Sequence, residues 1–285
     1  MGRSHAHVGA ALALLGSFAL AYADVFRWLL TDWQLDGDYS HGLLIVPVAA
    51  YLAYERRHAL RDTPRNPSWT GLIILACSLG LLVVGTLSSQ FLTRVSIVTT
   101  VIAALVYVLG WRHVRVLAFP IAFLLLMIPP PEIVFNRVTG SLQLVASSFA
   151  EQVLVGWDIP VFRAGNVLNL PRINLDVAEA CSGIRSLTTL VAFGALYGNY
   201  ALPTAWQRWA LIVMTVPIAT VANGLRVAGT GLTAYYYGLE TATSFFHTFS
   251  SLVVFLIALV ALPLVSWCLK WRPPGRAWVA TERAV

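Results

Sequence analysis

The chain has 285 residues, of which 58% are hydrophobic and only 11% are charged. Soluble domains carry about 25% charged residues, so this chain lacks the charge needed to cover a water-exposed surface. Hydrophobic runs of roughly 18–20 residues recur along its whole length, and a run of that length spans a bilayer as a helix. The composition therefore excludes a soluble globular protein and predicts an all-α polytopic membrane protein.

The formal net charge of +6 would suggest nucleic-acid binding in a soluble protein. In a membrane protein, basic residues instead gather in the short cytoplasmic loops. The sequence has no basic stripe with interleaved aromatic residues. We therefore expect membrane lipid as a partner and no nucleic acid.

The apolar runs predict about eight transmembrane helices. These runs lie near residues 8–30, 41–55, 69–87, 93–111, 114–130, 183–201, 208–225 and 247–269. If the N-terminus is cytoplasmic, the inside loops receive Arg56, Arg61 and Arg112, and the outside loops receive Asp36 and Glu132. This distribution follows the positive-inside rule. We expect both termini in the cytoplasm.

The chain reads as one membrane domain, residues 1–285, with a long outside insertion at residues 131–182 that leads to Cys181. Prolines at the start of this insertion end the fifth run, because proline cannot continue a helix. Apolar residues then recur at helical spacing over residues 133–155, which predicts an amphipathic helix on the membrane surface. Residues 159–177 alternate apolar and polar side chains around Gly and Pro, which predicts a short hairpin.

Three polar residues at the outer ends of the predicted spans have side chains suited to covalent catalysis. Cys181 stands at the start of the sixth span, Arg226 at the end of the seventh and His247 at the start of the eighth. A helix N-terminus favours the thiolate, which is the reactive form of cysteine. His247 could then carry a proton and Arg226 could stabilise an oxyanion. Asn223 precedes Arg226 by three residues and shares its helical face.

Each of these residues also has a structural interpretation. Cys181 could be a buried packing thiol, and Arg226 could be a lipid-headgroup anchor or part of an ion pair. Arg185 is expected to pair with Glu179 or another acid, and His41 to form a hydrogen bond at a helix start or to support the site. The spacing of His, Cys and acidic residues is too wide for a metal site, so we expect neither metal nor cofactor. Spacing alone leaves the enzymatic and structural interpretations open.

The motifs themselves resemble those of a known family. "AEACSGIRS", "VANGLRV" and "FFHTFSS", in this order, are similar to the three signature motifs of exosortases and archaeosortases, and "DYSHG" followed by "YLAYERR" resembles their N-terminal signature. The resemblance extends over residues 36–260. It implies Cys181 as nucleophile, Arg226 as transition-state stabiliser and His247 as proton donor or acceptor.

The resemblance also implies a substrate and a location. The substrate would be a secreted protein with a C-terminal sorting signal, made of a Pro-Glu-Pro-like motif, a transmembrane helix and a basic cluster. Attack by the thiol would give a thioacyl enzyme, resolved by water or by an amine-bearing acceptor. A bacterial member would lie in the inner membrane with its active site facing the periplasm.

Two other functions fit parts of the sequence. A transporter or assembly factor for surface polysaccharide or lipid could use Arg226 and Arg185 to bind anionic groups, but it would carry charges near the membrane midplane. A thiol oxidoreductase would need a second cysteine beside Cys181. Most polar residues instead lie at the outer span ends, which favours a cysteine enzyme.

Overall fold

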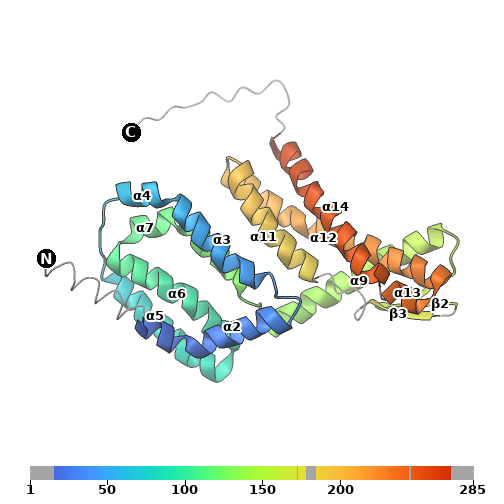
Figure 1. Cartoon of the computed structure of the whole chain (residues 1–285), viewed down its shortest axis with the longest axis horizontal. Helices are drawn as coiled ribbons and strands as arrows, with labels where there is room; N and C mark the ends of the chain where they lie inside the picture. The colour runs from blue at the N-terminus through green and yellow to red at the C-terminus, as the bar shows by residue number, and fades with distance from the viewer. Residues whose placement is uncertain (1–15, 172, 178–183, 244, 271–285) are drawn as a thin grey trace. The chain divides into compact units, whose positions relative to one another are not determined.

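The structure is a computed structural model and describes residues 16–171, 173–177, 184–243 and 245–270. Most of the described chain is helical, with a single small sheet (Figure 1). Contacts divide it into two compact units, residues 1–136 and residues 137–285. One helix, α9, begins in the first unit and continues into the second.

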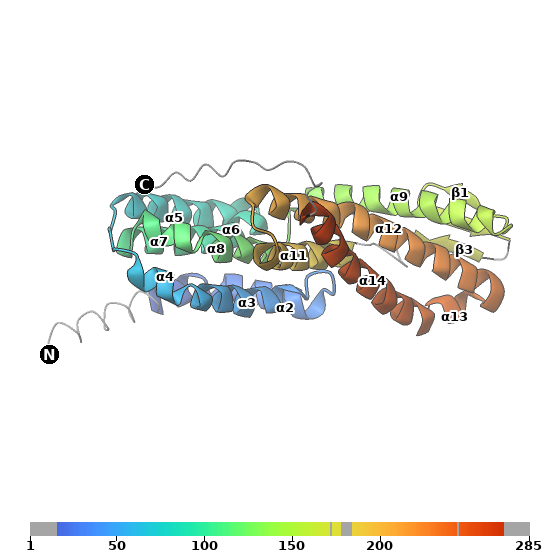
Figure 2. The same ribbon diagram turned by 90° about the horizontal axis from the view of Figure 1, so that it is seen from above.

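The first unit is built from short and medium-length helices. They are α2 (Ala23–Leu35), α3 (Gly42–Glu55), α4 (Arg57–Asp62), α5 (Thr70–Ser88), α6 (Gln90–Val108), α7 (Trp111–Val116), α8 (Ala118–Leu124) and the 3-10 turn η1 (Leu125–Met127). Seen from above, α2 and α3 form one layer and α5 to α8 a second (Figure 2).

Helices α5 and α6 form a tight antiparallel hairpin. A Cβ on Gly71 would come within 2.4 Å of the backbone nitrogen of Tyr107, so only glycine allows this approach. Between the helices the hydroxyl of Ser78 lies 2.6 Å from that of Thr100, which also contacts the Tyr22 hydroxyl at 2.7 Å. Small residues and buried hydroxyl pairs are typical of helix packing in membranes.

The path from α8 to α9 is set by prolines. Ile128 has an extended backbone, as expected for a residue before proline. Pro129 and Pro130 follow, and the carbonyl of Pro131 accepts hydrogen bonds from the first turn of α9 (Glu132–Gly156). Proline is favourable at this position because the first helical amides need no partner within the helix.

The second unit combines the rest of α9 with a small sheet and the C-terminal helices. These elements are β1 (Phe162–Ala164), β2 (Val167–Leu170), β3 (Ile173–Asp176), α11 (Ile184–Ala201), α12 (Ala205–Tyr237), α13 (Leu239–Thr243) and α14 (Phe245–Lys270). The strands are antiparallel in the order β1-β2-β3. In both views α11, α12 and α14 lie together (Figures 1 and 2).

A buried core joins α9, the sheet and the second half of α12. Leu154 of α9, Leu168 of β2 and Val177 just after β3 are fully buried in it, and Val227 of α12 is 1% exposed. A Cβ on Gly224 of α12 would come within 2.6 Å of the Phe149 ring, so glycine is required for α9 to pack this closely. The sheet is thus anchored beside the turn of α12 that carries Arg226.

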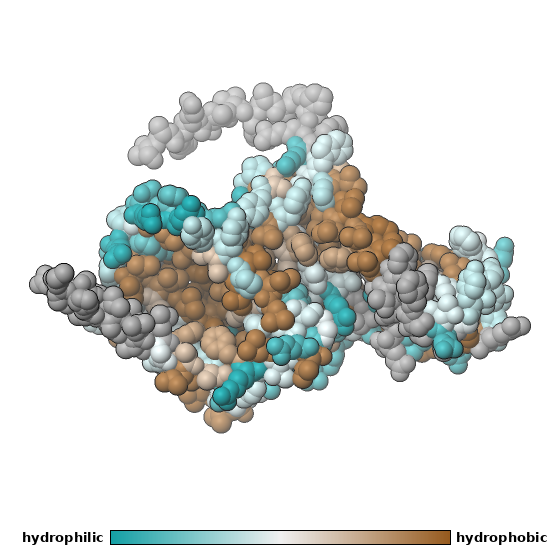
Figure 3. Space-filling view, in the orientation of Figure 1, coloured by the Kyte–Doolittle hydropathy of each residue, from teal (hydrophilic) through white to brown (hydrophobic). Residues whose placement is uncertain are grey.

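Among the described residues, three helices are long and apolar enough to cross a membrane. They are Thr70–Ser88, Gln90–Val108 and Ala205–Tyr237, or four spans if Ala118–Met127 and Glu132–Gly156 count as one bent span. Many of their apolar side chains are exposed, including Val83, Leu87 and Val213, each at least 60%. Figure 3 shows hydrophobic surface over the helices of the first unit and a hydrophilic patch over α4. Lipid, not water, is the solvent that such a surface requires.

The sequence-based description differs from this fold in three respects. Within the described residues, the predicted count of about eight spans is not confirmed. The predicted hairpin at 159–177 is a three-stranded sheet, because the chain turns a second time after Leu170. The predicted span 208–225 is part of a longer helix, α12, which ends only at Gly238, where φ is 88°. Glycine adopts this backbone conformation at little cost and is therefore a common helix stop.

Candidate active site

The candidate site lies where α11, α12 and α14 meet. Arg226 and Asn223 project from one face of α12, and Asn223 is 4% exposed while Arg226 is half-buried. Together with Ser186 of α11 and Phe255 of α14 they line a cavity of about 10 Å³. This is about the space of one water molecule, so these four side chains pack close to one another. The cavity brings the two motif residues of α12 against both neighbouring helices.

The backbone around Arg226 is held firmly. Its carbonyl accepts a hydrogen bond of 2.9 Å from the buried hydroxyl of Thr230, one turn later. The next residues, Val227 and Ala228, belong to the core shared with α9 and the sheet. One side of this turn is therefore fixed by apolar packing, and the side with Arg226 faces the small cavity.

Helices α11 and α12 run antiparallel in a defined register. A Cβ on Gly194 would lie 2.8 Å from the methyl of Thr215, and Ser186 lines the same cavity as Asn223. The eight residues from Gly194 back to Ser186 in α11 therefore lie beside the eight residues from Thr215 on to Asn223 in α12. This register brings the first turn of α11, with Ser186, beside the turn of α12 that carries Arg226.

The predicted site residues are only partly described. Cys181 and Glu179 lie outside the described residues. Arg185 is exposed on the first turn of α11. Its predicted pairing with Glu179 falls outside the described residues. His247 lies in the first turn of α14. Phe255, eight residues later on α14, lines the cavity beside Arg226.

His41 belongs to the first unit, where it is the N-cap residue of α3. Its side chain makes no capping hydrogen bond to the first turn of α3. Its Nδ1 atom is buried and has no hydrogen-bond partner in the described part of the chain. Burial lowers the pKa of the His41 ring, and the backbone of Leu126 and of Asp38 opposes this shift.

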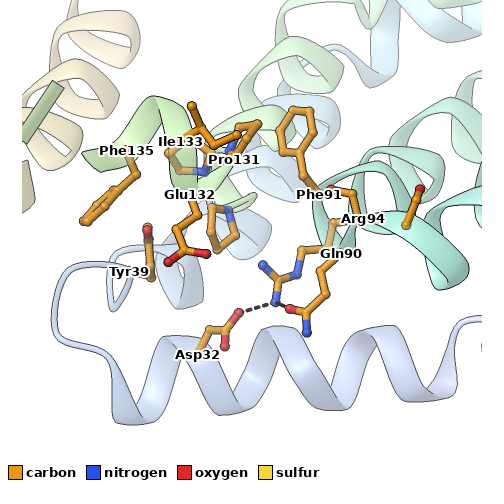
Figure 4. A pocket seen from close by; sticks show the side chains of 13 residues that line it. Asp32, Tyr39, Gln90, Phe91, Arg94, Pro131, Glu132, Ile133 and Phe135 are labelled. Atoms are coloured by element: carbon orange, nitrogen blue, oxygen red, sulfur yellow. Dashed lines mark hydrogen bonds and ion pairs between the residues drawn. The ribbon is translucent and has the colours of Figure 1, made fainter. Parts of the chain in front are cut away.

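A second polar site in the first unit was missed by the sequence interpretation. A cavity of about 590 Å³ is lined by Asp32 and Tyr39 near the start of the chain, by Gln90 and Arg94 of α6 and by Glu132 of α9 (Figure 4). Arg94 donates to Asp32 at 2.5 Å and to Gln90 at 2.9 Å.

The acidic groups around this cavity also affect the phenol of Tyr39. Burial, with further contributions from Asp36 and Asp38, raises the pKa of Tyr39 to about 12. The sequence signal for this site was an arginine inside an apolar run, because a charge at such a position needs a partner or a role.

No group of three or more His, Cys, Asp or Glu side chains within the described ranges could hold a metal ion. The described polar residues at the junction of α11, α12 and α14 are an amide, a guanidinium and a hydroxyl. Such groups bind and orient oxygen atoms, and a guanidinium can stabilise negative charge. The described arrangement can therefore bind a small oxygen-bearing group beside a guanidinium.

Residues 33–264 match the family model of transmembrane exosortases, Exosortase_EpsH. The chain belongs to the exosortase family. The matched range contains all four motifs noted in the sequence, including those around Arg226 and His247. Exosortases are in general membrane cysteine proteases or transpeptidases, and the family acts on C-terminal sorting signals of its substrates. The apolar helices agree with a membrane protein of this family.

No curated protein and no solved structure matches this exosortase.

Proposed function

We propose that the chain is a membrane-embedded cysteine transpeptidase or protease that cleaves the C-terminal sorting signal of secreted proteins. Cys181 is the nucleophile, Arg226 stabilises the oxyanion and His247 transfers the proton. The signal consists of a Pro-Glu-Pro-like motif, a transmembrane helix and a basic cluster. This substrate class follows from membership of the exosortase family.

The observation that carries the proposal is the anchoring of the chain on both sides of Cys181. Val177, four residues before it, is fully buried in the same core as Val227, the residue after Arg226. Ser186, five residues after it, lines a cavity with Arg226 itself. Only a short segment separates Cys181 from each of these two described anchors. Both anchors thus favour a thiol close to the Arg226 guanidinium.

The position of His247 fits the same site. The side-chain amide of Gln207, near the start of α12, donates to the carbonyl of Leu269, near the end of α14, at 2.9 Å. The two helices are therefore antiparallel, and Phe255 lies opposite the Arg226 region. His247 precedes Phe255 by roughly two helical turns, about 12 Å along the axis. This moves it toward the C-terminal part of α12, which contains Arg226.

The reaction has two stages. The Cys181 thiolate attacks the scissile carbonyl carbon, and Arg226 donates hydrogen bonds to the oxyanion that forms. The intermediate collapses with cleavage of the C–N bond, and the protonated His247 gives its proton to the leaving amine. Water or an acceptor amine then attacks the thioester, His247 accepts its proton and the Cys181 thiolate leaves.

The charges of the first unit support a periplasmic site in the bacterial inner membrane. Its acidic end carries Asp32, Asp36 and Glu132, and the short helices α4 and α7, which follow the other ends of α3 and α6, carry Arg61 and Arg112. By the positive-inside rule, the basic end is cytoplasmic. Residues 131–182 are then outside. A span of about 20 residues from Ala205 would also leave Arg226 at the outer boundary.

A processing assay in cells tests this function. A secreted reporter with the three-part tail is co-expressed with the wild type or with Cys181→Ala, Arg226→Ala or His247→Ala. The wild type is expected to shorten the reporter, and the three variants to leave it intact. Loss of tail removal is scored by size, and membrane insertion of each variant is checked in parallel.

Two other cysteines provide the matched control. Cys77 and Cys268 are exposed and free, and neither lies in a catalytic motif. A Cys77→Ala/Cys268→Ala chain should process the reporter at the wild-type rate. Tail removal that persists in Cys181→Ala would exclude Cys181 as nucleophile.

A further inference from the structure

A second large cavity lies at the opposite end of the first unit from Asp32 and Arg94. It has a volume of about 700 Å³, within the range of ligand-binding pockets in proteins. Its lining comes from α4 and the segment after it, from the end of α6, from α7 and from the start of α8. All of these elements belong to the first unit, and none carries a residue of the proposed active site.

The mouth of this cavity is basic. Arg61 and Arg65 line it, both are exposed, and neither forms an ion pair within the described part of the chain. Two unpaired guanidinium groups at one cavity favour a ligand with negative charge. Guanidinium groups match phosphate oxygens well because they present several donors in one plane.

The floor of the cavity contains a buried polar side chain. His113 of α7 lines the cavity and is 3% exposed, and its Nδ1 atom has no hydrogen-bond partner among the described residues. A buried polar atom without a partner is costly. A bound group with oxygen atoms would supply that partner.

The remaining walls are apolar. Leu105 near the end of α6, Leu109 just after it and Leu117 just before α8 line the same space. A free inorganic anion gains nothing from leucine side chains, whereas an acyl chain does. The combination of two arginines with leucines therefore fits an amphipathic anion.

Aromatic side chains place this end of the unit at the level of lipid headgroups. Trp69 and Tyr107 stack edge to face at 6.1 Å, and the indole of Trp111 donates to the Thr70 hydroxyl at 3.0 Å. All three rings are exposed and flank the ends of α5 and α6. Tryptophan and tyrosine concentrate at membrane–water interfaces.

We infer that this cavity is a binding site for an anionic glycerophospholipid. The phosphate lies between Arg61 and Arg65, a headgroup or phosphate oxygen meets His113, and an acyl chain lies along the leucines. Basic pockets between helices at the cytoplasmic side are known to suit such headgroups. Through this site, the basic end of the first unit would bind one class of lipid selectively.

The full chain, purified in detergent, is titrated with phosphatidylglycerol, phosphatidylcholine or inorganic phosphate, and bound lipid is measured by native mass spectrometry. Phosphatidylglycerol should bind well, phosphatidylcholine poorly, and inorganic phosphate should not compete at equal concentration. An Arg61→Gln/Arg65→Gln chain should lose affinity for phosphatidylglycerol about 30-fold, as expected for two arginine–anion contacts.

An Arg112→Gln/Arg115→Gln chain is the matched control. It removes the same charge from α7, at exposed residues that do not line the cavity. It should bind phosphatidylglycerol within about twofold of the wild type, since only general attraction is lost. His113→Leu should also weaken binding while leaving thermal unfolding of the empty protein unchanged.

Three results would overturn the inference. Equal losses of phosphatidylglycerol affinity in the two double variants would show that only the net charge of the chain matters. Equal binding of the two lipids would remove the role of the anionic headgroup. Displacement of the lipid by inorganic phosphate would identify a phosphate site without an acyl component.

Discussion

The guanidinium of Arg94 in α6 lies 2.5 Å from the carboxylate of Asp32 in α2, although 62 positions separate them in the sequence. Only 7% of the Arg94 side chain is exposed, against 32% for Asp32. The pair joins the two helical layers of the first unit. It explains how an arginine is tolerated inside a helix that is otherwise apolar enough to span a membrane.

Removing one partner of this pair should destabilise the first unit. Arg94→Met leaves the Asp32 carboxylate without its main partner. The expected loss is roughly 2–3 kcal/mol, below the value of a fully buried pair because Asp32 keeps contact with water. Chemical unfolding in detergent, followed by circular dichroism, measures it.

The Arg163–Glu151 pair is the control for this prediction. It has a similar separation of 2.8 Å, but both side chains are 30% exposed. Arg163→Gln should cost at most about 1 kcal/mol. An Arg94→Met chain no less stable than Arg163→Gln would show that the Arg94–Asp32 pair has no structural role.

Gly224 should be intolerant of a side chain. Alanine there would place its Cβ 2.6 Å from the Phe149 ring and push α9 away from α12, beside Arg226. We expect Gly224→Ala to lower stability by about 1–3 kcal/mol through overpacking and to slow processing. Gly140→Ala, in α9 with no atom within 4 Å of its Cβ position, should be neutral or stabilising. Equal effects of the two substitutions would contradict the close packing of α9 on α12.

The buried ring of His41 should make stability depend on pH. Its pKa is lowered in the folded protein. Below about pH 6.5 the unfolded chain therefore binds more protons than the folded protein does. Stability contributed by the neutral ring is present above that pH and is lost as the pH falls toward the folded pKa. The melting temperature of the wild type should therefore drop from pH 7.5 to pH 5.5 more than that of His41→Gln. An identical drop in both chains would rule out His41 as the source.

A lysine should not replace Arg226. Lysine keeps the charge but loses the planar set of donors that a guanidinium offers to an oxyanion. If Arg226 stabilises the transition state, Arg226→Lys should lower the processing rate by about 10²–10³-fold. The amount of substrate bound to the membrane protein should stay unchanged, as measured by co-purification. A normal processing rate in Arg226→Lys would show that Arg226 contributes only its positive charge or a structural contact.

The elements that depend on local pattern could be predicted from the sequence. The apolar spacing over residues 133–155 predicted a helix, and α9 runs from Glu132 to Gly156. The full length of α12 could not be predicted, for a physical reason. A polar Arg226 suggested a span end, but a helix continues through an arginine and stops where Gly238 adopts a positive φ.

Long-range pairing could not be predicted. The sequence gives no sign that Arg94 meets Asp32, or that Arg61 and His113 line one cavity, because these contacts depend on how helices pack. The break between α7 and α8 was also hidden, since residues 114–130 look like one apolar run. Motif order nevertheless pointed to the junction of α11, α12 and α14, where Asn223 and Arg226 line a common cavity.

The central claim is a thioacyl intermediate on Cys181, and interception by hydroxylamine tests it most directly. Membranes containing the enzyme and a tailed reporter are incubated with hydroxylamine in water enriched in oxygen-18, and the new C-terminus of the reporter is weighed by mass spectrometry. The account predicts a C-terminal hydroxamate that forms with the wild type and disappears with Cys181→Ala. A product that carries only a carboxylate labelled from water at every hydroxylamine concentration, or one that still forms with Cys181→Ala, would contradict it.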